Sequence, residues 1–174
     1  MKKRILVITF VFLSFTLIKS QTITQMGFII KKAIPSIKNI AVIHPKKMHD
    51  KISKEARMAQ IVTKNKFTIY AAVRRKDEIF KQIYNINRLK DVAVIIITDD
   101  DILSIDSVKY LLNKFNEQKI PVISNRKKDT LIGVLMTIFK NVDKIEKHIN
   151  KIVASALELS FSEEFLSECI IDVE

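Results

Sequence analysis

The stretch VAVIIITDDD, residues 92–101, decides the fold of this 174-residue chain. It begins with six apolar residues and a threonine, and strands that are apolar on both faces are typical of parallel sheets covered by helices on both sides. Three aspartates follow directly. The stretch therefore predicts a buried strand that ends in a carboxylate cluster. Such a cluster could ligate a metal, accept a phosphoryl group, hold a cationic ligand or cap the next helix.

Compact β-branched runs alternate with amphipathic segments on either side of this strand. Further strands are predicted at residues 37–45, 66–74, 120–124 and 133–139. The segments between them place apolar residues on one helical face, as Phe80, Ile83 and Ile86 do. A short helix is predicted before Pro35, a long closing helix at 142–156, and a mix of short helix and strand at 161–174. This alternation predicts a single doubly wound α/β domain with about five parallel strands flanked by helices.

The first 21 residues, MKKRILVITFVFLSFTLIKSQ, have the layout of a secretory signal peptide. Three basic residues precede a mostly apolar run of 14 residues, 5–18, which is shorter than the ~20 residues of a membrane-spanning helix. A retained membrane anchor is the alternative interpretation. We therefore expect a signal peptide at residues 1–20, a single domain at 21–174, and a periplasmic or otherwise extracytoplasmic location.

Composition argues against several classes of protein. The formal net charge of +11 falls to +7 without the four basic residues of segment 1–20, and the remaining lysines are scattered, which favours a solvated surface over a nucleic-acid site. Gly27 and Gly133 are the only glycines, so a P-loop or dinucleotide fingerprint is not present. No G-x-S-x-G motif occurs, and the single cysteine, Cys169, lies in the tail. We therefore expect no nucleic-acid partner, no cofactor and no enzymatic activity.

The carboxyl ends of the predicted strands carry the candidate site residues. In an open parallel sheet, ligands bind in the crevice beyond these ends. The ends here carry His44, Asp99, Asp100, Asn125 and Asn141. We expect these side chains to form one ligand-binding edge, at which Asp99 contacts the ligand and Asp100 assists.

Two alternatives give residues Asp99–Asp101 another role. A metal-dependent module or enzyme would need further ligands, but only His44 of the three histidines falls at this edge, and no two histidines have metal-ligand spacing. A receiver-like signalling domain would use an aspartate here as phosphoacceptor. Response-regulator receiver domains end their first strand in an acidic pair, where this chain has Ile43, His44 and Pro45. Ser104 is a candidate N-cap for the following helix. We predict no metal site.

Three stretches resemble the ABC-transporter substrate-binding proteins of the two-lobed periplasmic type, whose relatives bind amino acids. They are FIIKKAIPSIKNIAVIHP (28–45), VAVIIITDDDILSIDSVKYLL (92–112) and KIPVIS (119–124). The resemblance runs from about Met26 to Ala156 and covers only the second half of such a protein. It places Asp99 on the family's aspartate after this strand and Asn125 directly after its I-P-V strand. Asn141 and Val142 stand where the family often has an Asp-Tyr pair.

The resemblance implies one lobe of a periplasmic-binding-protein-like fold. We expect a noncatalytic, extracytoplasmic module that binds a small molecule, such as an amino acid, or an envelope protein partner, and that is linked to transport or sensing. A homodimer would supply the surface of the absent lobe. Contact with the membrane is expected only through the signal peptide or a transient encounter with a transporter.

Overall fold

A computed structural model of the chain describes residues 23–72, 76–98 and 102–172, and it contains one sheet of seven strands. The strands are β1 (Asn39–Pro45), β2 (Lys66–Ala72), β3 (Val92–Ile96), β4 (Val122–Ser124), β5 (Met136–Asn141), β6 (Lys144–Asn150) and β7 (Ile170–Asp172). The α-helices are α1 (Ile23–Ala33), α2 (His49–Thr63), α3 (Lys76–Asn87), α4 (Ile105–Asn116), α5 (Lys151–Ala156) and α6 (Glu163–Ser167). Two short 3-10 helices, η1 (Lys46–Met48) and η2 (Lys127–Ile132), follow β1 and β4.

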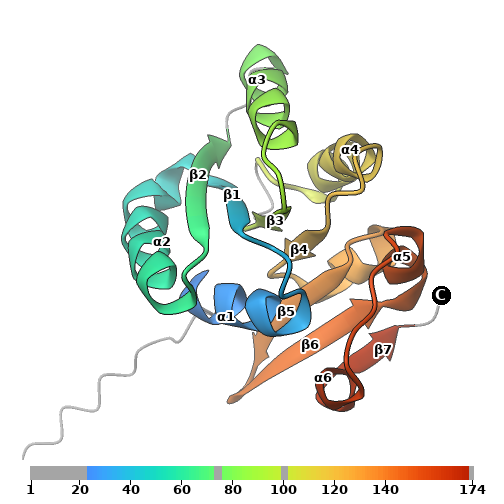
Figure 1. Cartoon of the computed structure of the whole chain (residues 1–174). Coiled ribbons are helices and arrows are strands. Elements are labelled where there is room, and N and C mark those ends of the chain that lie inside the picture. The colour runs from blue at the N-terminus through green and yellow to red at the C-terminus, as the bar shows by residue number, and fades with distance from the viewer. Residues whose placement is uncertain (1–22, 73–75, 99–101, 173–174) are drawn as a thin grey trace, which may run out of the picture.

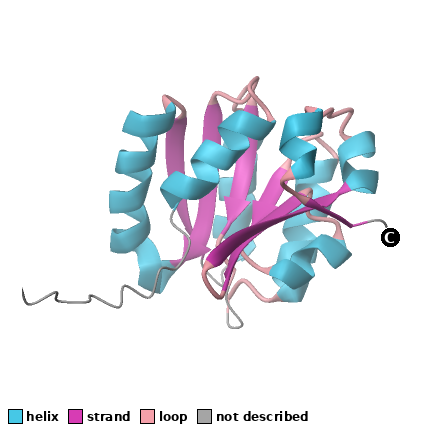
Figure 2. Cartoon of the chain, turned by 90° about the horizontal axis from the view of Figure 1, so that it is seen from below, coloured by secondary structure: helices cyan, strands magenta, loops and turns pink. Residues whose placement is uncertain are grey.

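The strand order is β2-β1-β3-β4-β5-β6-β7, and the first five strands are parallel (Figure 1). Every residue of β3 is buried, as the apolar run at its centre predicted. Alternate residues of this strand point to opposite faces, so Ala93 and Ile95 pack with α1, α2 and the C-terminal helices, whereas Val94 and Ile96 pack with α3 and α4. Figure 2 shows the resulting twisted sheet flanked by helices. The predicted doubly wound α/β domain is confirmed.

The predicted strand at 133–139 is shifted, and the predicted closing helix at 142–156 is wrong over most of its length. Gly133 ends η2 with a φ of 98°, so β5 starts only at Met136. The chain then reverses at Val142 and returns as β6, which is antiparallel to β5. Only Lys151–Ala156 is helical. The sheet consequently has seven strands rather than about five.

Three smaller expectations can be compared with the structure. Ser104 is the N-cap residue of α4, as predicted, although its side chain makes no cap hydrogen bond and its Oγ lies 3.3 Å from Oγ of Ser107. Ile83 and Ile86 of α3 are buried as expected. Phe80, predicted on the same apolar face, is instead 52% exposed. In the described part of the chain, no helix combines the length and the apolar character needed to cross a membrane.

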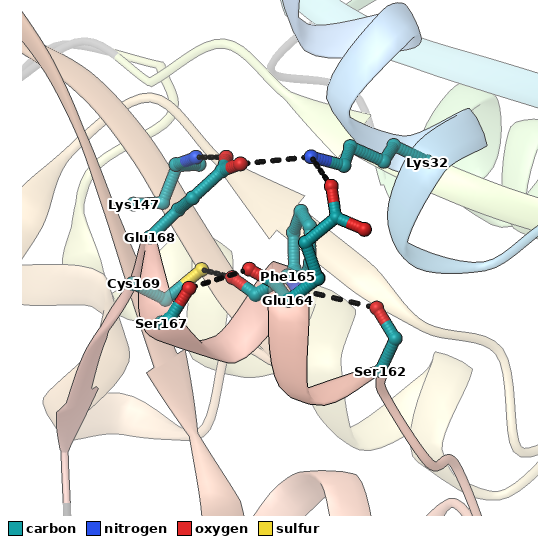
Figure 3. Close-up of polar contacts among 8 residues, drawn as sticks. All are labelled: Lys32, Lys147, Ser162, Glu164, Phe165, Ser167, Glu168 and Cys169. Atoms are coloured by element: carbon teal, nitrogen blue, oxygen red, sulfur yellow. Dashed lines mark hydrogen bonds and ion pairs between the residues drawn. The ribbon is translucent and has the colours of Figure 1, made fainter.

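The C-terminal residues combine a short helix and a strand, as predicted, and charged side chains hold them in place. Glu168 accepts from Nζ of Lys32 on α1 at 2.8 Å and from Nζ of Lys147 on β6 at 2.6 Å (Figure 3). Glu164 lies 3.3 Å from the same Lys32 ammonium. Phe165, in the same helix, is buried, and Nζ of Lys147 lies 5.5 Å from the centroid of its ring. The last segment is therefore fastened both to the first helix and to β6.

Candidate functional site

The carboxyl ends of β1, β3, β4 and β5, with the loops that follow them, form one edge of the sheet, which we call the rim. This is where open parallel sheets of this kind bind ligands. The structure places Asn125 and Asn141 at the rim and His44 near the end of β1. Asp99 and Asp100, like Asp101, lie outside the described residues, so their expected role stays a prediction.

Asn125 connects two loops of the rim. Its Oδ1 accepts hydrogen bonds from the backbone N–H of Thr98 at 2.8 Å and from the Thr98 hydroxyl at 3.0 Å, which joins the loop after β3 to the loop after β4. Both neighbours of Asn125 are anchored by the buried Asp129 carboxylate. The Asp129 carboxylate accepts one hydrogen bond from Nε of Arg126 at 2.8 Å and another from the hydroxyl of Ser124. The backbone that presents Asn125 is therefore fixed on both sides.

Asn125 also lines a cavity of about 240 Å³ at the rim, on the face of the sheet that α1 and α2 cover. We call it the rim cavity. Its apolar walls include Met48, Ile97 and Phe139. Its other polar residues are Lys51 and Glu55 from α2 and Lys140 from the end of β5. A charged and an apolar lining thus meet in a cavity of small-molecule size.

The carboxylate of Glu55 is held in place by two neighbours. Its Oε2 accepts from the backbone N–H of Ile23, the first residue of α1, at 2.9 Å, and its Oε1 lies 4.0 Å from Nζ of Lys51. Across the cavity, Nζ of Lys140 lies 3.8 Å from Oδ1 of Asp143. The rim cavity therefore contains a carboxylate, two ammonium groups and the Asn125 amide.

Strand register explains why β5 contributes to this cavity. The last pair between β4 and β5 joins Ser124 to Thr137, and β5 continues four residues further, to Asn141, before β6 returns. The β5–β6 hairpin therefore extends past the ends of β3 and β4. Phe139 and Lys140 on this extension form one wall of the rim cavity.

The other two candidates lie apart from the rim cavity. His44 is fully buried, and its Nδ1 lies 3.0 Å from the carbonyl oxygen of Pro45, to which it donates in the neutral form. Burial lowers the pKa of His44, and its ring lies beside that of His49, with centroids 5.3 Å apart and the ring planes tilted by 37°. Asn141 lies at the hairpin, where its Nδ2 donates to Oε1 of Glu146 at 2.5 Å. Neither residue is among those that line the rim cavity.

Sequence reasoning missed the charged residues of α2. Glu55 lies beside the buried positions Ile52, Ala56 and Ala59, so the helical pattern alone gave it no special role. A usable signal was present, because α2 follows the end of β1 and its first turns must lie near the rim. Within the part of the chain that the structure describes, no three His, Cys, Asp or Glu side chains are grouped as a metal site would require.

Comparison with known proteins bears on the fold. No protein-family model and no curated protein sequence matches the chain. Several solved structures are similar to it, three of which are described below. One is a conserved domain protein from Vibrio cholerae, with a TM-score of 0.72 and 13% sequence identity. Another is an ABC domain in complex with L-Trp from Streptococcus pneumonia, with a TM-score of 0.71 and 14% identity. A third is the ligand-free, open form of a substrate-binding protein with adhesive properties from Clostridium difficile, with a TM-score of 0.69 and 15% identity.

The alignments cover 85%, 86% and 87% of this chain but only 59%, 60% and 59% of the three solved chains, in the same order. The chain thus spans about three fifths of the length of the structures it matches. At such low identity the likeness concerns the fold alone. The resemblance seen in the sequence is confirmed at that level, and the chain has the fold of a substrate-binding-protein lobe.

Proposed function

We propose that this chain is an extracytoplasmic, noncatalytic binding module of a single lobe, linked to transport or sensing, and that its rim cavity takes a small zwitterion such as an amino acid. One observation carries the proposal. The rim cavity brings a carboxylate, two ammonium groups and an amide together at the edge where this fold places ligands.

The lining of the rim cavity complements both charges of a zwitterion. The ammonium groups of Lys51 and Lys140 attract a carboxylate, and the carboxylate of Glu55 attracts an ammonium group. The volume of about 240 Å³ lies just below the ~300–1,000 Å³ of ordinary ligand pockets, which favours a molecule of amino-acid size over a nucleotide. Met48 and Phe139 would contact an apolar side chain of the ligand.

A lobe that binds alone leaves one side of its ligand open. We propose that a second copy of this chain or an envelope protein covers that side. Cys169 gives no support to a nucleophilic enzyme, because burial raises the pKa of its thiol and its Sγ donates to the carbonyl of Phe165 at 3.1 Å.

The test is a thermal-unfolding screen of the full chain against the common amino acids. We expect one subset to raise the midpoint of unfolding, since a ligand that binds only the folded state stabilises it by mass action. The variants Asn125→Ala and Glu55→Gln should reduce this rise. Asn116→Ala, which removes an exposed amide at the end of α4, is the matched control and should not.

Other outcomes favour other functions. If no amino acid shifts the midpoint while the chain forms dimers or captures an envelope protein, the small-molecule proposal is wrong and the partner-protein alternative gains. If only Mg²⁺ or Ca²⁺ shifts it and Asp99→Asn abolishes that shift, the metal-dependent alternative replaces it.

A further inference from the structure

A second cavity lies on the other face of the sheet, between α3 and α4. Its volume is about 480 Å³, within the range of ligand pockets, and its floor is formed by residues of the core cluster that α3 and α4 cover, among them Ile43 and Leu111. It shares no lining residue with the rim cavity. We call it the α3–α4 cavity.

Two aromatic side chains that line this cavity are exposed. Ile83 and Ile86 are buried against the sheet, whereas Phe80, one turn earlier, is 52% exposed and Tyr110 on α4 is 37% exposed. The rings of Phe80 and Tyr110 meet edge to face, with centroids 6.1 Å apart at an angle of 81°. Two aromatic rings beside an apolar cavity are therefore in contact with water. An apolar group bound in the cavity would remove water from their exposed surface, which is favourable.

The polar residues of the α3–α4 cavity decide which ligand fits. The Gln82 amide is engaged, because its Nε2 donates to the carbonyl of Ala71 at 2.8 Å. The Ser107 hydroxyl lies 3.3 Å from that of Ser104. Asp106, in the first turn of α4, is the one charged side chain among the described residues that line the cavity. Its negative charge favours a cationic group, and the faces of nearby aromatic rings also attract cations.

From this combination we propose that the α3–α4 cavity is a second binding site, which takes a small aromatic cation such as an arylalkylamine. The ring of the ligand packs on Phe80 and Tyr110 over the apolar floor, and its ammonium group pairs with Asp106. This site is separate from the zwitterion site of the proposed function, and it does not depend on that proposal.

Three probes with the same ring and different head groups test the charge. They are 2-phenylethylamine, which is cationic, 2-phenylethanol, which is neutral, and 3-phenylpropionate, which is anionic. Binding to the full chain can be located by NMR of labelled tyrosine, because the chain has three tyrosines and Tyr110 alone of them lines the cavity. We expect the amine to shift the Tyr110 signal most at equal concentration, and the signals of Tyr70 and Tyr84 little.

Variants separate the ring contact from the charge contact. Asp106→Asn should raise the Kd of the amine by about fivefold, the equivalent of one exposed ion pair, and leave that of the alcohol nearly unchanged. Glu163→Gln, which removes an exposed first-turn carboxylate of α6, is the charge control. Phe80→Ala should raise the Kd of both the amine and the alcohol by about five- to tenfold. Tyr84→Ala, an exposed ring of α3 that does not line the cavity, is its control.

The Tyr110 signal itself distinguishes this site from the rim cavity, because none of the residues that line the rim cavity is a tyrosine. The proposal is overturned if none of the probes shifts Tyr110, if the amine and the anion bind equally, or if Asp106→Asn and Glu163→Gln have the same effect. Because Asp106 and Phe80 are both exposed, these variants are expected to fold, and circular dichroism checks this directly.

Discussion

The parallel strands β1 to β5 and the C-terminal residues 144–172 share apolar packing but differ in how much polar contacts add to it. The parallel half has a β-branched core in which β1, β3 and β4 are almost wholly buried. In the C-terminal segment, residues 144–172, Ile149 and Phe165 join the core, but β6 begins exposed, α5 and α6 are six and five residues long, and ion pairs and caps also fasten the chain. The contrast teaches that apolar burial dominates at the centre of the domain, whereas individual polar contacts supplement it at the edge.

The largest effect is expected from Ile95→Ala in the parallel half. Ile95 is fully buried in the central strand, and truncation removes apolar contacts and leaves a cavity, at a cost of about 3 kcal/mol of unfolding free energy. Urea denaturation measures it. Ile61→Ala on α2, where the side chain is 63% exposed, is the matched control and should change the free energy by less than ~0.5 kcal/mol. Equal effects would remove the contrast between core and surface.

Asn150→Ala, in the C-terminal segment, should lower the free energy of unfolding by about 2 kcal/mol. The lost helix cap and the lost buried hydrogen bond each account for about 1 kcal/mol of this. Asn150 is the N-cap of α5, where its Oδ1 accepts from the N–H of Val153 at 3.0 Å, and its Nδ2 donates to the carbonyl of Thr130 at 3.0 Å. Asn150→Ser can still cap the helix but is too short for Thr130, so it should lose only about 1 kcal/mol. A Ser variant as unstable as the Ala variant would contradict this division.

Val142→Gly should stabilise the protein, by about 1 kcal/mol. Val142 sits in the two-residue turn of the β5–β6 hairpin with a φ of 52° and a side chain that is 83% exposed. A β-branched residue is strained at positive φ, and glycine is not. Val142→Ala should gain less, because alanine keeps a Cβ. A glycine variant that unfolds at a lower denaturant concentration than the wild type would contradict the assigned strain.

Glu168→Gln should have the smallest effect, because the Glu168 side chain is partly exposed and solvent screens its pairs with Lys32 and Lys147. Hydrogen bonds and charge from Lys147 and Lys32 hold the pKa of Glu168 at about 2, below the usual 4.5. The folded-state pKa is depressed, so the stabilisation is present above pH 4.5 and is lost as pH falls toward 2. The difference in unfolding midpoint between wild type and variant should vanish over that range. A difference that persists at pH 2 would contradict the role of charge.

The same contrast explains what the sequence could predict. In the parallel half, compact apolar runs between helical segments have one stable arrangement, so the fold class and the position of β3 were predictable. Beyond β5, Ile145 and Ile149 are four residues apart, a spacing that fits one face of a helix and also one face of a strand. The turn between β5 and β6 has Val142 and Asp143 rather than the glycine that marks most hairpins, so the reversal gave no local signal.

The candidate site was predictable in the same partial way. The rule that ligands bind beyond the carboxyl ends of strands located the rim and Asn125, which lines the rim cavity. It could not show that His44 points into the core, because both faces of β1 are buried. It also could not place Glu55 and Lys140 together, since their proximity depends on how α2 packs and how far β5 extends.

The extension of β5 also restricts the shape of any protein that covers the rim. The four residues of β5 beyond its last pair with β4 correspond to roughly 13 Å of strand. The antiparallel strand β6 pairs with the same stretch, so the projection is two strands wide. Among the described strand residues, a flat surface would meet the hairpin before it reached the ends of β1, β3 and β4. We therefore expect a partner, or a second copy of this chain, to bring a stepped or protruding face that fits beside the hairpin. Replacing residues 139–146 by a short turn would remove that requirement and admit flatter surfaces.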